Sequence, residues 1–109
     1  MMLTARRAVL AAAALAFTAS ATAGGDIEAG RIKANTCMGC HGIPNYNNAY
    51  PTYRVPRLGG QHPEYIVAAL KEYREGKRPH PTMSAQAMAL GDQDIEDIAA
   101  YLAKAPAHK

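Results

Sequence analysis

The two cysteines of this chain, Cys37 and Cys40, lie three residues apart in the stretch NTCMGCHGIP (residues 35–44), and His41 follows directly. A pair at this spacing can be a redox dithiol, half of a zinc site or a short disulfide. A thioredoxin-like dithiol needs alternating strands and helices, and no stretch here has the pattern of a strand. A zinc site needs four ligands at closed spacing, which the other histidines do not supply. A disulfide across two residues closes so small a loop that it stabilises little.

His41 changes the chemistry that this motif favours, because Cys-x-x-Cys-His is the attachment signature of c-type haem. At a helix end, residues three apart share one face, so both thiols can reach the vinyl groups on one edge of a porphyrin. The next side chain can then place its imidazole under the iron. We therefore predict one covalent haem c on Cys37 and Cys40, with His41 as an axial iron ligand. A dithiol or disulfide module is the remaining alternative.

The first 23 residues have the layout of a secretory signal peptide. Arg6 and Arg7 precede an uncharged apolar run at 8–17, and residues 21–23 (ATA) form a cleavage site. We expect a mature domain over residues 24–109 and a periplasmic location. The apolar run is too short to span a bilayer comfortably, and no later stretch is apolar enough for a membrane span.

Charge and composition give no support for nucleic-acid binding. Once Arg6 and Arg7 are set aside, basic and acidic residues nearly balance, so the pI near 9.0 describes the precursor. The tyrosines are dispersed and do not alternate with basic residues as in a strand-binding groove. A domain this small buries a limited core and usually needs a disulfide, a metal or a cofactor.

Helices must position the motif, since no segment has the alternation of a strand. The apolar patterns predict three of them, over about 26–38, 63–76 and 92–103. Pro63 suits a first helical turn and Gly76 suits a C-terminal cap. Residues 42–61 predict a long loop, which in a compact domain is usually functional. Pro79 and Pro81 predict a second irregular stretch, with one short turn after it.

Five stretches, taken in order, resemble the class I c-type cytochromes, in particular the short bacterial cytochromes of the c4 and c553 kind. They are CMGCHG (37–42), PRLGGQHPEYI (56–66), YREGKR (73–78), PTMSAQAMAL (81–90) and GDQDIEDIAAYLA (91–103), which cover most of residues 26–103. The resemblance implies an all-α class I cytochrome c fold, with three to four helices and long loops wrapped around one haem.

The same resemblance gives the PRLGG segment a place beside the haem. Pro56 would present its carbonyl oxygen to the Nδ1–H of His41, and Leu58 would pack on the haem face. Gly59 and Gly60 would permit close approach of the backbone. Four residues of the loop before this segment are candidates to cover the propionates, or are simply exposed; they are Tyr46, Tyr50, Tyr53 and Arg54.

The sixth iron ligand has four candidates, which are Met83, Met88, His80 and His62. Met83 lies in a proline-rich loop that can aim its side chain, and its position matches the family pattern. Met88 lies in an apolar, helix-like run and is expected to fill the core. His80 is expected to be exposed, and His62 to lie at a helix cap. We favour Met83, with Met88 as the alternative, and a thioether ligand raises the reduction potential relative to a second histidine.

These residues predict a periplasmic monohaem cytochrome that carries one electron between a donor and an acceptor, such as a respiratory complex, an oxidase or a dehydrogenase. A filled sixth position leaves no open site for a substrate, so we expect electron transfer and no enzyme activity. The alternative is a haem subunit of a periplasmic oxidoreductase complex.

Overall fold

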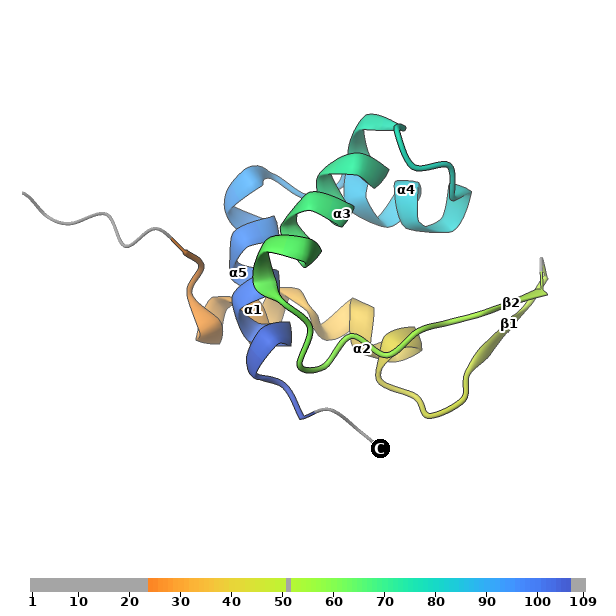
Figure 1. Ribbon diagram of the computed structural model, residues 1–109, viewed down its shortest axis with the longest axis horizontal. Coiled ribbons are helices and arrows are strands. Elements are labelled where there is room, and N and C mark those ends of the chain that lie inside the picture. The colour runs from red at the N-terminus through yellow and green to blue at the C-terminus, as the bar shows by residue number, and fades with distance from the viewer. Residues whose placement is uncertain (1–23, 51, 107–109) are drawn as a thin grey trace, which may run out of the picture.

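The computed structural model describes residues 24–50 and 52–106. Its elements, in chain order, are α1 (Ile27–Lys33), α2 (Asn35–His41), β1 (Asn47–Ala49), β2 (Thr52–Arg54), α3 (Pro63–Glu75), α4 (Pro81–Met88) and α5 (Asp92–Lys104) (Figure 1). The all-α class is confirmed, but this part of the chain has five helices where three to four were predicted. No helix among these residues is long and apolar enough to cross a membrane. The predicted signal peptide, residues 1–23, lies outside the described residues.

Local signals set most helix ends where the sequence predicts them. The Asp26 carboxylate accepts a hydrogen bond from the Ala29 amide at 3.0 Å and caps α1. Pro63 occupies the first turn of α3, and Gly76 ends that helix with a φ of 75°, a left-handed conformation that glycine adopts without strain. The Gly91 amide donates to the Asp94 carboxylate at 2.9 Å at the start of α5.

The predicted first helix is in fact two helices. The chain turns at Ala34, whose side chain is fully buried, and α2 then runs to His41. The Cys-x-x-Cys-His motif therefore lies wholly within α2, and Gly42 caps the end of that helix.

The irregular stretch predicted around Met83 is wrong, because α4 begins at Pro81 and contains Met83. Proline is compatible with a helix at its first position, where its missing N–H would have no partner in any case. His80 is the N-cap residue: its Nδ1 accepts a hydrogen bond from the Met83 amide at 3.3 Å. Pro79 and Pro81 therefore stand on either side of His80, the residue that caps the start of α4.

The predicted long loop contains a short antiparallel hairpin, so the expectation of no strands is also wrong. Asn48 of β1 lies opposite Tyr53 of β2 in the ladder. Both strands are exposed on alternate residues and have no apolar face. For that reason the period-two apolar pattern that announces a strand is missing from the sequence.

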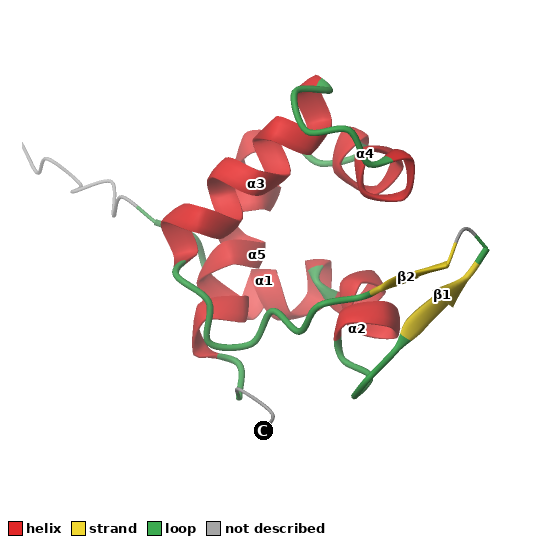
Figure 2. Ribbon diagram, turned by 45° about the vertical axis from the view of Figure 1, so that its right-hand side comes forward, coloured by secondary structure: helices red, strands yellow, loops and turns green. Residues whose placement is uncertain are grey.

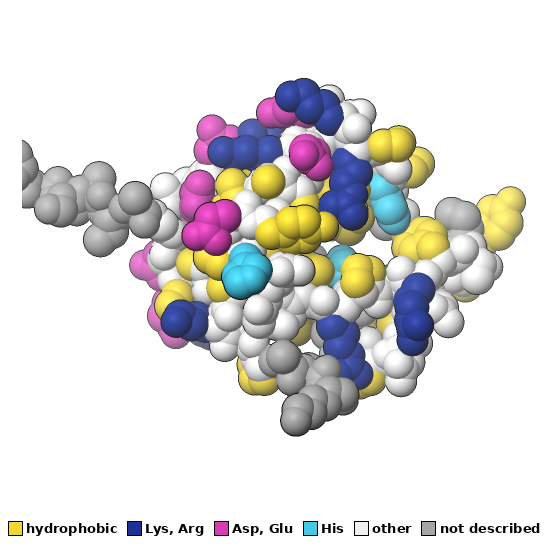
Figure 3. All heavy atoms as spheres, in the orientation of Figure 1, with side chains coloured by type: hydrophobic (Ala, Val, Ile, Leu, Met, Phe, Trp, Pro, Cys, Tyr) yellow, Lys and Arg dark blue, Asp and Glu magenta, His cyan; other side chains and the backbone are white. Residues whose placement is uncertain are grey.

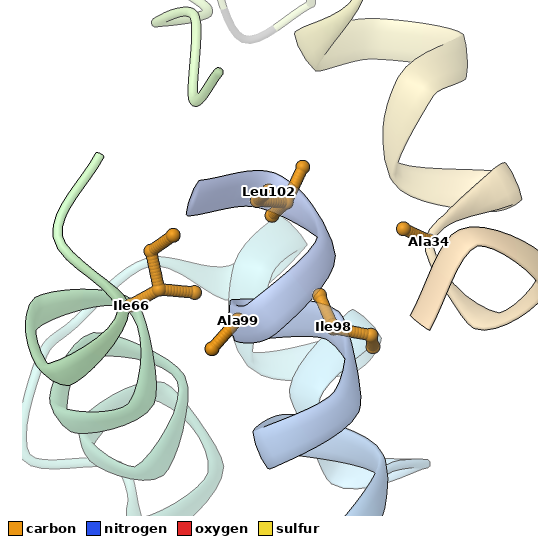
Figure 4. Packing of buried hydrophobic residues seen from close by; sticks show 5 residues of the cluster. All are labelled: Ala34, Ile66, Ile98, Ala99 and Leu102. Carbon is orange, nitrogen blue, oxygen red and sulfur yellow. The ribbon is translucent and has the colours of Figure 1, made fainter. Parts of the chain in front are cut away.

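The core forms where α5 passes between α3 and the junction of α1 with α2. Figure 4 shows the buried side chains that meet there, which are Ala34, Ile66, Ile98, Ala99 and Leu102. The helices α1 and α5 approach closely because Gly30 faces α5, and a Cβ at Gly30 would overlap the carbonyl oxygen of Asp97. The first and last helices therefore pack directly on each other.

Asp97 of α5 also fastens this crossing. Its carboxylate is almost fully buried and accepts hydrogen bonds from the Lys33 Nζ at 2.5 Å, the Asp26 amide at 2.8 Å and the Gln93 side chain at 2.8 Å. The hydrogen bond from Lys33, followed by those from Asp26 and Gln93, lowers the pKa of Asp97 to about 2. A buried carboxylate with three donors is a structural link between the two ends of the domain.

Candidate functional site

Residues of α2, α3, α4 and the chain that leaves β2 line a cleft of about 480 Å³. Figure 2 shows how these elements are arranged. The volume of the cleft is in the range of pockets that bind small molecules and cofactors. Its inner part is apolar and includes Ile66, Leu70, Leu90, Ile98 and Leu102. Three of these side chains also belong to the buried core, so the cleft reaches to the centre of the fold.

The motif residues Cys37, Cys40 and His41 all line this cleft. Both cysteines are free thiols; Cys37 is half-buried and Cys40 is exposed. Burial raises the pKa of the Cys37 thiol. Because α2 carries the three residues on consecutive turns, it presents two sulfur atoms and one imidazole to the same space.

The imidazole of His41 is oriented by the backbone. Its Nδ1 lies 2.6 Å from the carbonyl oxygen of Pro56, which is the contact that the family resemblance implies. When Nδ1–H donates to this oxygen, Nε2 keeps its lone pair and can coordinate a metal ion. Leu58 follows in the same segment, lines the cleft and packs on the core.

The adjacent PRLGG glycines allow close approach of the backbone, as predicted. A Cβ at Gly59 would overlap the Pro106 carbonyl oxygen. Gly60 has a φ of 81° and donates its amide to the Leu102 carbonyl at 3.0 Å. The segment that carries Pro56 and Leu58 is thereby attached to the end of α5.

The two candidate methionines point in different directions from α4. Met83 is half-buried and lines the cleft. Met88 is 71% exposed and does not line it, so the expectation that Met88 fills the core is wrong. Residues five apart on an α-helix are separated by roughly 140° around its axis, so one face of α4 cannot present both.

The two candidate histidines also differ. His62 is exposed at the N-cap of α3 and does not line the cleft. His80 lines the cleft and is half-buried, which corrects the expectation that it is exposed. Its ring lies between those of Tyr53 and Tyr73, with centroid distances of 4.8 and 5.9 Å. Its Nδ1 already accepts the Met83 amide.

The cleft carries positive charge and no carboxylate among its described lining residues. Arg54, Arg57 and Arg78 line it, together with the hydroxyl-bearing Tyr53 and Tyr65. Of the loop tyrosines considered from the sequence, Tyr53 alone lines the cleft. The chain has no Asp or Glu between residues 28 and 64, and Figure 3 shows the acidic side chains of this face over α1, α3 and α5, away from α2 and the hairpin.

Other kinds of site find less support in the described residues. They contain no group of three or more His, Cys, Asp or Glu side chains that could hold a metal ion, which argues against a zinc site. A larger and more open groove of about 790 Å³ follows the outer side of α3 and α5, but it contains none of the motif residues.

Comparison with known proteins agrees with this geometry. The family model described as Cytochrome c matches residues 28–106. The chain is 46% identical over 83 residues to cytochrome c4 from Thiocapsa roseopersicina, which covers 75% of this chain and 41% of that protein. It is 42% identical over 80 residues to cytochrome c-554(548) from Halomonas halodenitrificans, covering 71% of this chain and 93% of that one.

A solved structure, reduced recombinant cytochrome c4 from Pseudomonas stutzeri, superposes with a TM-score of 0.59 at 25% identity, over 76% of this chain and 52% of that chain. The chain spans less than half the length of the cytochrome c4 relatives that it matches. The family match, the relatives and the shared structure show that this chain belongs to the cytochrome c family and has its class I, all-α fold.

Proposed function

We propose that this protein is a periplasmic monohaem cytochrome that carries single electrons between redox proteins. The observation that carries the proposal is the arrangement of the cleft: Cys37, Cys40 and His41 line it from α2, and Met83 lines it from α4. Figure 2 shows these two helices well separated, with α4 in the upper part of the view and α2 in the lower part. The single Cys-x-x-Cys-His motif of the chain supports one haem.

The residues present fit a covalently held haem. Cys37 and Cys40 supply two thiols from one helix, and both are free. The apolar inner wall suits a porphyrin ring, while Arg54, Arg57 and Arg78 suit its two carboxylates. Haem bound in this way supplies one-electron chemistry between ferric and ferrous iron.

In this proposal His41 and Met83 would hold the haem iron. Pro56 fixes the orientation and tautomer of His41 through the Nδ1 hydrogen bond, which makes the imidazole a stronger donor. The soft Met83 thioether favours reduced iron. With both positions filled, no substrate reaches the metal, so the protein is a carrier and not an enzyme. Leu58, Ile98 and Leu102 exclude water from the inner part of the cleft.

The proposed location and partners follow from the sequence. Residues 1–23 serve as a signal peptide, and residues 24–109 are the exported domain. Partners are a donor and an acceptor protein that contact the cleft rim at the α2 and hairpin side, where acidic side chains are missing. Such a partner would carry the complementary negative charge.

The experiment is expression with a periplasmic haem-attachment system. We expect haem to stay on the polypeptide in a denaturing, reducing gel, and the mass to equal that of residues 24–109 plus one haem. The ferric protein should show the weak far-red band of an iron–sulfur bond, and the ferrous protein should bind carbon monoxide slowly. Alkylation of both cysteines in that preparation would contradict covalent attachment. Fast carbon monoxide binding would indicate an open iron site and favour an enzyme or a sensor.

The alternative role is a haem subunit of an oxidoreductase. Purification of the protein from its native source distinguishes this role from that of a free carrier. A free carrier elutes alone at the size of one chain. Stable co-elution with a flavin or molybdenum protein, in stoichiometric amount, would replace the carrier role with that of a bound subunit.

A further inference from the structure

The helix that carries Met83 has few neighbours. Among the described elements, the backbone of α4 lies close to that of α3 and to that of no other helix or strand. Ala87 is its one buried residue. Backbone packing therefore holds α4 on one side only, while Met83 faces the cleft on another. Side-chain contacts must supply the remaining support for the first turn of the helix.

Tyr53 makes such a contact from the hairpin. Its hydroxyl donates a hydrogen bond to the Oγ1 of Thr82 at 2.9 Å, across 29 residues of chain. Its ring also meets the ring of His80 edge to face, with centroids 4.8 Å apart and planes at 78°. Ring pairs in this geometry contribute more stability than the area that they bury accounts for. One side chain of β2 thus holds both the N-cap residue of α4 and a residue of its first turn.

His80 passes this support on to Met83. Its Nδ1 accepts the Met83 amide at 3.3 Å, which satisfies one of the unpaired N–H groups at the start of α4. Its ring also meets the ring of Tyr73, in α3, at a centroid distance of 5.9 Å. The three rings therefore form a continuous row from the hairpin through the cap of α4 to α3.

From these contacts we propose that Tyr53 and His80 are positioning residues that hold α4, and with it Met83, against the cleft. We call the two side chains with their partner Thr82 the hairpin clamp. The proposal rests on the proposed function in one respect, which is that Met83 is the iron ligand. The hairpin, which exposes most of its own surface, then serves to limit opening of the methionine side of the site. Release of the clamp lets the first turn of α4 move outward and exposes the iron to small ligands.

The test compares Tyr53→Phe with Tyr50→Phe in the haem-loaded protein. Tyr53→Phe removes the hydroxyl and keeps the ring, while Tyr50 is 95% exposed in the same hairpin and serves as the matched control. The first measurement is amide hydrogen exchange over residues 84–88 of α4. The second is the rate at which ferric protein binds cyanide. Loss of one such hydrogen bond should raise both rates roughly three- to tenfold, because it shifts a local opening equilibrium by that factor.

Further variants of His80 and Thr82 separate the parts of the clamp. His80→Asn keeps an acceptor at the N-cap and removes the ring contacts, whereas His80→Phe keeps the ring and removes the acceptor. Each should accelerate both rates less than His80→Ala, which removes both. Thr82→Val should accelerate them as much as Tyr53→Phe does, and the double variant should add little, because both changes remove the same hydrogen bond.

The outcomes distinguish this inference from the proposed function. If Tyr53→Phe and His80→Ala match the parent and Tyr50→Phe in both rates, the clamp does not hold α4 and the inference is wrong. If the parent lacks the far-red band but Tyr53→Phe still accelerates exchange in α4, the clamp is upheld and methionine ligation is wrong. If the parent shows a normal far-red band, and this band weakens in His80→Ala but is retained in His80→Asn, the result supports both the clamp and methionine ligation.

Discussion

Met83 and Met88 belong to the same eight-residue helix, yet Met83 lines the cleft while Met88 is 71% exposed. We expect Met83→Ala to keep its haem, because in the proposed site Cys37 and Cys40 would hold the ring independently of Met83. The variant should lose the far-red band, show a lower reduction potential and bind cyanide quickly. Its free energy of unfolding should fall by about 2 kcal/mol or more, near the low end for a truncated methionine because the side chain is half-buried. Optical titration and denaturant unfolding measure these changes.

Met88→Ala is the control on the same helix. An exposed side chain contributes little to packing, so the free energy of unfolding should change by less than about 0.5 kcal/mol. The far-red band and the potential should match the parent. If instead Met88→Ala removes the band and Met83→Ala retains it, the ligand assignment must be reversed.

Gly30→Ala should destabilise the protein strongly. The added methyl group would overlap the backbone carbonyl of Asp97, and backbone cannot move aside as a flexible side chain can. We expect a loss of about 3 kcal/mol in the free energy of unfolding, at the upper end for an overpacked core. Urea unfolding of the haem-loaded protein measures it.

Gly39→Ala is the matched helical control, since nothing lies within 4 Å of the added Cβ. Alanine favours a helix more than glycine does, so stability should rise by up to about 1 kcal/mol. Equal losses in the two variants would mean that the close crossing of α1 and α5 is not what Gly30 permits.

The Asp97 carboxylate makes stability depend on pH in the acid range. Its pKa is lowered from 3.8 to about 2 in the folded protein, chiefly by the hydrogen bond from Lys33. A lowered pKa means that folding favours the ionised form, so this contribution is present in full above pH 4 and is lost as pH falls toward 2. Asp97→Asn should therefore be less stable than the parent at pH 7, with a difference that narrows between pH 4 and pH 2.

Lys33→Met provides the complementary measurement. The hydrogen bond from Lys33 is the largest cause of the lowered Asp97 pKa, so removing it should raise that pKa. Acid unfolding should then begin at a higher pH than in the parent. The measurement for both variants is the denaturant midpoint of unfolding at several pH values. If the difference in stability between Asp97→Asn and the parent stays constant down to pH 2, ionisation of Asp97 is not linked to folding.

Pro56→Ala should leave the haem site intact, because the acceptor for His41 is a backbone oxygen that alanine also has. The reduction potential and the His41 Nδ1–H resonance should be unchanged. The free energy of unfolding should fall by about 0.4–1 kcal/mol, since the unfolded chain gains freedom. A large shift in potential would show that the proline ring itself, and not only its carbonyl, fixes the imidazole.

Local signals let the sequence predict α3 and α5 closely. Pro63 and Gly76 mark the two ends of α3, and Asp92 begins α5 with a regular apolar stripe behind it. The partnership of His41 with Pro56 was implied by family resemblance, and no periodicity could have supplied it. These features depend on short-range patterns or on motifs with a fixed order.

The features that the sequence did not predict depend on long-range contacts. Asp97 looks like one more acidic residue on α5 until α1 brings Lys33 and the Asp26 amide to it. The start of α4 at Pro81 is capped by a histidine, which is an unusual N-cap residue. The sequence of α4 could not predict that the Met88 side chain is exposed, because so short a helix of mostly small residues has no clear apolar stripe.

The direct packing of α1 on α5 sets the order in which the chain can complete its fold during synthesis. The haem motif in α2 is made long before α5, so until α5 arrives Ala34 and the rest of the junction lack the surface on which they pack. The packing of α1 on α5 closes a loop that contains nearly all of the domain, and closing so long a loop has an entropic cost. This cost delays the first stable structure until the chain is nearly complete. We therefore expect Cys37 and Cys40 to stay on an unfolded segment until synthesis is nearly complete, accessible to any enzyme that must reach both thiols before the domain closes around them.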